Sequence, residues 1–278
     1  MDTTARIIEK QDLTDITKLF VVHAPLVAHN AGPGQFVILR VSETGERIPI
    51  SITDFDRDAG TITIVVQEVG RTSTLVGKLA VGDEILDFAG PLGMEVTLPE
   101  EGHSVLIGGG FGTGALFPLA RELRSRGVRV SSIVGARTLE LLILTDLLTT
   151  ASDELHICTN DGSLGYRGFV TGRLEELMDA GADFTHCFAV GPMPMMRAVA
   201  ETTRRRGLPA MVSLDPLMVD GTGMCGGCRV SVGGKSFFAC VDGPFFDAHE
   251  VDFDEADARL TTYNEQEELA CELAGVGR

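Results

Sequence analysis

Three of the six cysteines lie close together, with the spacing of metal ligands. Cys225 and Cys228 form a C-x2-C pair with two glycines between them, and Cys240 follows after eleven further residues. Glycine permits the tight turn that such a pair needs and lets backbone N–H groups approach the sulfur atoms. Clustered cysteines in a chain of this size favour a metal site over a disulfide framework. The remaining cysteines stand alone, and we expect them to be buried apolar side chains: Cys158, Cys187 and Cys271.

Three thiolates need a fourth ligand, and the candidate is Asp220. It precedes Cys225 by four intervening residues, so the array reads D-x4-C-x2-C-x11-C. Plant-type [2Fe–2S] centres use C-x4-C-x2-C with a distant fourth cysteine, and a carboxylate can also bind iron, although it is a harder ligand than thiolate. The pattern favours a [2Fe–2S] cluster with an altered reduction potential. Two alternatives stay open: Asp220 can be a turn residue before Gly221, and the cysteines can hold structural zinc.

A glycine run at residues 108–115 is the second chemical signal. It follows an apolar strand and opens a helical pattern, and backbone N–H groups at such a junction suit a diphosphate. Its Gly110-x-Gly112-x-x-Ala115 core satisfies the relaxed dinucleotide fingerprint, but Arg137 stands where an acidic residue is expected. Arg137 can hold a 2′-phosphate or simply be solvated, and a lone glycine run can be a plain turn. The candidate contacts are Gly109, Gly110, Gly112, Thr113, Gly114 and Arg137.

Two further loops carry glycines at the ends of predicted strands. One contains Asp161 and Gly162; the other contains Gly191 and Pro192 and opens a helix that carries Met195. Ligands of parallel α/β sheets bind at the carboxyl ends of the strands. Three glycine-bearing loops on one edge therefore predict a nucleotide site. Met195 is included among its contacts, although a methionine there is more often part of the core.

The elements that position these residues suggest an α/β plus all-β protein. Residues 1–99 contain short runs rich in valine, isoleucine and phenylalanine, which predict an N-terminal antiparallel β-barrel or sandwich. Residues 100–213 alternate strands with helices, including helices over 115–126 and 140–148, which predicts a doubly wound parallel-sheet nucleotide domain. Residues 214–250 form a small iron–sulfur segment. The tail, 251–278, is acidic and expected to be helical.

Composition bounds the class of protein. The chain has 278 residues, a net charge of −17 and 44% hydrophobic residues, enough to bury real cores. The acidic balance argues against a nucleic-acid-binding protein, which usually carries a basic face. No apolar run approaches the roughly 20 residues of a membrane span, and the N-terminus lacks the pattern of a signal peptide. We therefore expect a cytoplasmic protein with neither nucleic-acid nor membrane partners.

Together these features resemble the ferredoxin reductase superfamily. A barrel, a Gly-Gly-Gly-x-Gly sheet, a Gly-Pro-x-x-Met-Met turn and a C-terminal [2Fe–2S] segment are shared with the branch that contains the dihydroorotate dehydrogenase electron-transfer subunit. Residues 218–228 and 238–244 look most like the small subunits of NADH-dependent reduced ferredoxin:NADP oxidoreductases, including their aspartate ligand. The dihydroorotate branch has cysteine at the position of Asp220. The resemblance covers nearly the whole chain.

The resemblance implies FAD on the barrel. The family's flavin motif is Arg-x-Tyr-Ser, or Arg-Pro-x-Ser in the dihydroorotate branch, and residues 46–52 read Glu-Arg-Ile-Pro-Ile-Ser-Ile. Ile48 stands where the arginine should be, and Arg47 is one place early. The stretch Gly-Arg-Thr-Ser at 70–73 resembles the second flavin loop, whose N–H and hydroxyl groups meet the diphosphate. By resemblance, the flavin contacts are Arg47, Pro49, Ile50, Ser51, Gln67, Gly70, Thr72 and Ser73.

The resemblance also implies a function. The chain would be an electron-transfer flavoprotein subunit that passes hydride between NAD(H) and FAD and electrons through the [2Fe–2S] cluster. Its heterodimer partner would be a larger flavoprotein with its own FAD and [4Fe–4S] clusters, and the complex would couple NADH, NADPH and ferredoxin by electron bifurcation. No catalytic side chain is required for hydride transfer. The alternatives are an electron-transfer subunit of a dihydroorotate or sulfide dehydrogenase and, from another class, a zinc-stabilised nucleotide-binding regulator. Arg137 leaves NADP possible.

Overall fold

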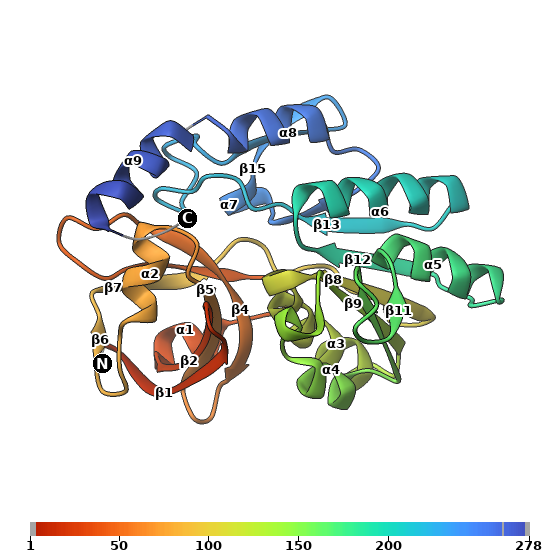
Figure 1. The fold of residues 1–278 in the computed structure, drawn as a ribbon, viewed down its shortest axis with the longest axis horizontal. Coiled ribbons are helices and arrows are strands. Elements are labelled where there is room, and N and C mark those ends of the chain that lie inside the picture. The colour runs from red at the N-terminus through yellow and green to blue at the C-terminus, as the bar shows by residue number, and fades with distance from the viewer. Residues whose placement is uncertain (1–3, 263, 276–278) are drawn as a thin grey trace. The chain divides into compact units, whose positions relative to one another are not determined.

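The computed structural model describes residues 4–262 and 264–275, and the chain divides into two compact units. The first unit contains Met1–Glu95, Asp215–Pro244 and Asp252–Arg278. The second contains Val96–Leu214 and Phe245–Val251. Each unit has its own sheet (Figure 1). The cysteine segment and the acidic tail belong to the first unit.

The first unit is built on a seven-stranded antiparallel sheet that curls into a near-barrel, which confirms the predicted all-β part. The strand order is β6-β1-β2-β5-β4-β3-β7. In β2, Phe20 and Val22 are completely buried and alternate with the half-buried Val21 and His23, because successive side chains of a strand point to opposite faces. The strands are β1 (Ala5–Thr14), β2 (Thr17–His23), β3 (Phe36–Arg40), β4 (Ile48–Asp56), β5 (Thr61–Gln67), β6 (Glu84–Ile85) and β7 (Asp87–Leu92), with the short helices α1 (Pro25–Asn30) and α2 (Arg71–Gly77).

The second unit confirms the predicted parallel sheet. Its strand order is β11-β10-β9-β8-β12-β13-β16, and all neighbours are parallel except the last pair. The chain moves outward from β8 in one direction and then resumes on its other side with β12, so the order reverses between these two strands. The strands are β8 (His103–Gly109), β9 (Arg129–Ala136), β10 (Glu154–Thr159), β11 (Tyr166–Arg167), β12 (His186–Val190), β13 (Ala210–Ser213) and β16 (Phe245–Asp247).

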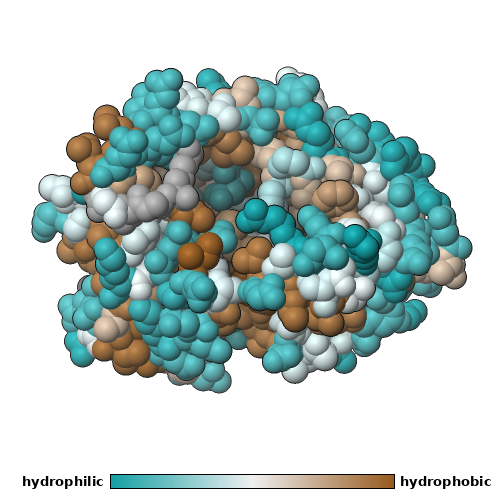
Figure 2. Space-filling view, in the orientation of Figure 1, coloured by the Kyte–Doolittle hydropathy of each residue, from teal (hydrophilic) through white to brown (hydrophobic). Residues whose placement is uncertain are grey.

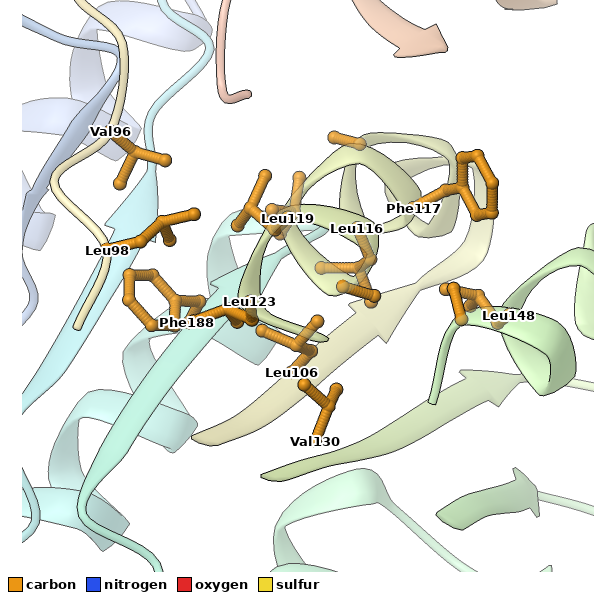
Figure 3. Packing of buried hydrophobic residues seen from close by; sticks show 14 of the residues in the cluster. Val96, Leu98, Leu106, Leu116, Phe117, Leu119, Leu123, Val130, Leu148 and Phe188 are labelled. Atoms are coloured by element: carbon orange, nitrogen blue, oxygen red, sulfur yellow. The ribbon is translucent and has the colours of Figure 1, made fainter. Parts of the chain in front are cut away.

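Helices cover both faces of this sheet: α3 (Leu116–Ser125) and α4 (Thr145–Ala151) on one, α5 (Val170–Asp179) and α6 (Met193–Arg206) on the other (Figure 1). Figure 3 shows how α3 inserts Leu116, Leu119 and Leu123 over Leu106 of β8 and Phe188 of β12. The helical spacing of these leucines makes one face of α3 completely buried, as predicted. Hydrophilic residues line the outer edge of the region over α5 and α6 (Figure 2).

The predicted helix over residues 140–148 is wrong in its bounds. The chain forms a short 3₁₀ turn at Leu139–Leu141, and α4 begins only at Thr145. Between them Leu144 has a φ of 57°, a left-handed conformation that residues other than glycine rarely adopt. This residue interrupts the helix, although its neighbours are good helix formers.

The chain returns to the first unit at Asp215, with the cysteine segment, and again at Asp252, after β16. A hairpin of β14 (Arg229–Val232) and β15 (Lys235–Phe238) leads into α7 (Ala239–Asp242). The described part of the acidic tail forms α8 (Phe253–Leu260) and α9 (Asn264–Ala274), as predicted. Within the described part of the chain, no helix is long and apolar enough to cross a membrane.

A buried histidine fixes the amino edge of the parallel sheet. His103 Nδ1 lies 2.9 Å from Asp183 Oδ1, and His103 Nε2 lies 2.8 Å from Ser131 Oγ. Ser131 is completely buried, so this Asp–His–Ser line is a structural network and not a hydrolytic site. The hydrogen bond with His103 lowers the pKa of the Asp183 carboxyl below its ordinary value.

We expect Asp183→Asn to destabilise the protein only where the carboxylate is ionised. Because the folded pKa is lowered, this stabilisation is present above the ordinary carboxyl pKa of about 3.9 and is lost as pH falls through the folded value. Urea unfolding at pH 7 should show a less stable variant, and the difference should shrink at pH 3. An equal difference at both pH values would contradict a charge-dependent role.

Candidate functional site

The β14–β15 hairpin brings two of the predicted cluster ligands together. Its turn uses Gly233 and Gly234, both with positive φ, and Arg229 pairs with Phe238 at the open end. Cys228 and Cys240 flank that open end, and their sulfur atoms lie 3.1 Å apart. Both side chains are buried, and the Cys240 N–H donates to Cys228 Sγ at 3.5 Å. Burial raises the pKa of the Cys240 thiol to about 12.

The other two predicted ligands are joined through the backbone. Asp220 Oδ1 accepts from the Thr222 N–H and Asp220 Oδ2 accepts from the Cys225 N–H, both at 2.9 Å. These backbone N–H groups lower the pKa of Asp220, so its carboxylate is charged. Cys225 is exposed, and its sulfur accepts from the Gly227 N–H at 3.5 Å. Across residues 4–262 and 264–275, no three histidine, cysteine or carboxylate side chains converge at metal-binding distance.

The donor set of this segment fits a thiolate-bound cluster. Asp220, Cys225 and Cys228 lie in one glycine-rich loop, Cys240 lies in α7, and backbone N–H groups already point at two of the sulfurs. N–H···S hydrogen bonds of this kind tune iron–sulfur centres. Asp220 also acts as the turn residue before Gly221 that the sequence left open, because its carboxylate closes the turn through Thr222. The turn role and a ligand role use the same side chain.

The cysteine segment packs on the barrel beside the flavin motif. Gly221 has a φ of 74°, and a Cβ there would lie 2.7 Å from Cδ1 of both Ile38 and Leu92. Only glycine therefore fits this position without rearrangement. Ile38 of β3 is paired with Pro49 of β4. Ile38 thus lies next to both the predicted flavin motif and Gly221, the residue after Asp220.

The predicted flavin residues occupy β4 and the start of α2. Pro49, Ile50 and Ser51 are half-buried on β4, and Gln67 ends the adjacent strand β5. At the start of α2, Ser73 Oγ accepts from the Gly70 N–H at 3.0 Å and holds the loop closed.

Two acidic residues that the sequence analysis did not single out bind polar and charged side chains near this loop. Glu46 Oε2 accepts from Thr72 Oγ1 at 2.9 Å. Asp87 Oδ2 binds both Arg40 Nε, at 2.6 Å, and Arg47 Nη2, at 3.3 Å. Arg40 is the main cause of a lowered pKa for Asp87. Arg47 is therefore already ion-paired with Asp87 at the start of β7, and no local sequence signal marks this pairing.

Two glycine loops meet where the order of the parallel strands reverses. Gly109 ends β8, and a Cβ there would clash with Met195 Sδ and lie 3.0 Å from Pro192 Cδ. A Cβ on Gly112 would lie 2.8 Å from the Val190 carbonyl oxygen and 2.9 Å from Gly191 Cα. Such switch points are the usual ligand sites of open α/β sheets. Gly110 is half-buried with a positive φ, whereas Thr113 and Gly114 are buried in the turn that precedes α3.

The loops after β9 and β10 form a second pair on the same edge. The Asp161 N–H donates to the Arg137 carbonyl oxygen at 3.3 Å, which joins the two loops. Asp161 Oδ1 accepts from Ser163 N–H and Oγ, which lowers the pKa of this exposed carboxyl, and Gly162 follows with a φ of 82°. Arg137 is exposed, and none of the described side chains forms a hydrogen bond or ion pair with its guanidinium.

Comparison with known proteins shows the family. Residues 215–252 match the model of the iron–sulfur cluster binding domain of dihydroorotate dehydrogenase B. A Thermotoga maritima protein described as a dihydroorotate dehydrogenase B (NAD(+)) electron transfer subunit homolog is 43% identical over 266 residues, 96% of this chain and 94% of the relative. The chain belongs to the dihydroorotate dehydrogenase B electron-transfer subunit family.

Other members and structures agree with this assignment. The dihydroorotate dehydrogenase B electron-transfer subunit of Geobacillus thermodenitrificans is 34% identical over 88% of this chain and 96% of its own. A solved NADH-dependent reduced ferredoxin–NADP oxidoreductase structure matches with a TM-score of 0.93 and 40% identity, over 98% of each chain. A carbazole dioxygenase ferredoxin reductase, 21% identical, matches 74% of this chain and 66% of its own with a TM-score of 0.65 and shows the shared fold alone. This family member is therefore an oxidoreductase flavoprotein subunit for electron transfer, with an iron–sulfur binding segment.

Proposed function

We propose that this chain is the NADH-oxidising small subunit of an electron-bifurcating NADH/NADPH/ferredoxin transhydrogenase. It would bind FAD on the barrel, NAD(H) at the carboxyl edge of the parallel sheet, and a [2Fe–2S] cluster on Asp220, Cys225, Cys228 and Cys240. When bound, these cofactors supply hydride transfer between nicotinamide and flavin and one-electron transfer onward. The partner would be a larger flavoprotein with its own FAD and [4Fe–4S] clusters.

One observation carries the electron-transfer part of this proposal: Ile38 contacts both candidate cofactor segments. It pairs with Pro49 in the flavin motif, and its Cδ1 lies against Gly221 beside Asp220. Cofactors held by these two segments would lie in the same compact unit, with Ile38 in contact with both segments, which suits electron exchange between them. Asp220 favours the bifurcating branch over the dihydroorotate branch, since the resemblance implies cysteine at that position in the latter.

The chain's own residues would bind and orient the cofactors. Gly109 and Gly112 let the backbone approach a dinucleotide diphosphate at the strand switch point. Gly70 and Ser73 present a closed turn to the flavin diphosphate. Because Arg47 is paired with Asp87, the flavin site differs from one in which a free arginine meets the phosphate.

Exposed apolar residues around the cysteines support docking of a partner at this segment. Met224 is 88% exposed although it directly precedes Cys225. The surrounding exposed apolar residues are Leu217, Val219, Phe238 and Val241. An apolar surface next to a redox centre suits a subunit interface, where apolar anchors supply much of the binding energy.

We expect Met224→Glu to weaken assembly with the large subunit at least about tenfold, because it places a charge in an apolar contact. The dissociation constant of the co-expressed heterodimer, measured by calorimetry or interferometry, tests this. Val81→Glu, which changes an exposed valine before β6, is the control. Equal effects of both variants would contradict docking at the cysteine segment.

We expect Arg137→Ala to raise the KM for NADPH about tenfold or more and to leave the KM for NADH nearly unchanged. A guanidinium at the end of β9 can form a charge-assisted pair with a 2′-phosphate, which NADH lacks. Steady-state kinetics with ferricyanide as acceptor measure both constants. An equal rise for both cofactors would assign Arg137 a general binding role.

The test of the proposed function is cofactor analysis of the anaerobically purified chain. We expect about two irons, two sulfides and one FAD per chain, NADH-dependent reduction of ferricyanide, and ferredoxin reduction only with the large subunit present. A changed cluster signal in the EPR spectrum of Asp220→Cys supports Asp220 as a ligand; an unchanged signal leaves it the turn role alone. A dihydroorotate-oxidising complex would support the alternative branch. A colourless, zinc-containing protein would overturn the proposal in favour of a regulator.

A further inference from the structure

Helix α8 brings a positive charge to the turn between two predicted cluster ligands. Arg259 Nη2 donates to the Gly227 carbonyl oxygen at 3.2 Å, and Gly227 lies within the Cys225–Cys228 turn. The helix is anchored on this side, because Phe253 and Ala256 are buried and the Asp252 side chain accepts from the Glu255 N–H at the first turn. The position of Arg259 is therefore fixed by the fold.

The Arg259 guanidinium has donor capacity left. Its Nε is buried, and the structure's described residues provide no hydrogen-bond partner for it. Leaving a buried donor unpaired is destabilising, more so for a charged group. A buried, unpaired N–H beside a predicted cluster loop points to a function that packing alone does not explain.

The charge of Arg259 is unusual in its surroundings. It is the only lysine or arginine between Lys235 and Arg278, in a stretch rich in aspartate and glutamate. A guanidinium stays charged at any working pH. Its partner carbonyl belongs to the same peptide group as the Cys228 N–H, so the hydrogen bond polarises a peptide attached to a predicted ligand.

We propose that Arg259 is a positioning residue that raises the reduction potential of the [2Fe–2S] cluster. This inference rests on the proposed cluster site. Reduction adds one negative charge to the cluster, and a nearby fixed cation stabilises that state. Arg259 would therefore partly neutralise the negative charge of a cluster held by three thiolates and the Asp220 carboxylate.

The experiment compares Arg259→Gln, Arg259→Lys and a control, Lys235→Gln, in the intact anaerobically purified protein. Lys235→Gln removes one positive charge from the exposed hairpin turn, away from the Gly227 carbonyl. Iron, sulfide and flavin contents are measured first, and the potential is then read from an EPR-monitored redox titration, which sees only loaded protein.

We expect Arg259→Gln to shift the cluster potential to more negative values, Arg259→Lys to shift it less, and Lys235→Gln to leave it close to that of the wild type. A wild-type potential in the loaded fraction of both Arg259 variants, with or without lost iron, would make Arg259 a structural anchor only and overturn the inference. A wild-type protein that contains no iron or sulfide would instead contradict the proposed function itself.

Discussion

Cys240→Ala is expected to abolish the iron–sulfur cluster while the flavin stays bound. Cys240 is buried with its sulfur 3.1 Å from that of Cys228, and alanine offers no ligand. The predicted flavin residues lie on barrel strands with a separate core, so the barrel should keep its fold. Iron should fall from about two atoms per chain to near zero. NADH–ferricyanide activity should persist, and electron delivery to the large subunit should be lost.

The matched control is Cys187→Ala, which removes an equally buried thiol from the parallel sheet. Burial raises the pKa of Cys187, so its thiol stays protonated, and it belongs to no metal-binding group of side chains among the described residues. This variant should keep its full iron content. Loss of iron from both variants would indicate general unfolding, and iron retained in Cys240→Ala would remove Cys240 from the ligand set.

The second large effect is expected at the strand switch point. Gly112→Ala places a Cβ 2.8 Å from the Val190 carbonyl oxygen and 2.9 Å from Gly191 Cα, and neither backbone atom can move aside as a side chain would. The two loops must separate, at a cost of about 1–3 kcal/mol. A displacement of about 1 Å in such a site can cost about 100-fold in rate. The kcat/KM for NADH should fall by about that factor.

Steady-state kinetics and isothermal titration with NAD(+) measure this loss, with flavin content as a check on folding. Gly127→Asn is the control, because Gly127 has a φ of 82°, which asparagine tolerates, and nothing lies within 4 Å of its Cβ position. Gly127 precedes β9 at the opposite edge of the sheet. Normal NADH kinetics in Gly112→Ala would exclude these loops as the dinucleotide site.

The sequence predicted those parts of the fold that leave a local pattern. The leucines of α3 recur at helical spacing, and the strands of the parallel sheet alternate with helices, so both were recognisable. The break at Leu144 was not, because its left-handed φ is imposed by tertiary structure on a residue type that does not favour it. The strand β16 lies on β13 after an excursion of about thirty residues, a pairing with no local signal.

In the candidate sites, too, the sequence could predict some contacts and not others. Gly112 and Gly191 could be predicted to lie near each other, because parallel strands bring their carboxyl ends to one edge. The pairing of Arg47 with Asp87, 40 residues away, depends on the register of β3 with β7 and is absent from any motif. Arg259 reaches Gly227 from a helix in the tail, across 32 residues. Spacing predicts which residues can bind a cofactor, whereas side-chain partners require the fold.

The position of β16 has a consequence for any attempt to isolate the nucleotide-binding unit. This strand pairs antiparallel with β13 and closes that side of the sheet, yet it is encoded after the cysteine segment. A fragment that stops at Leu214 would leave β13 with unpaired backbone groups, a template for edge-to-edge aggregation. A synthetic peptide of residues 245–251 should add back as the missing strand and keep such a fragment in solution.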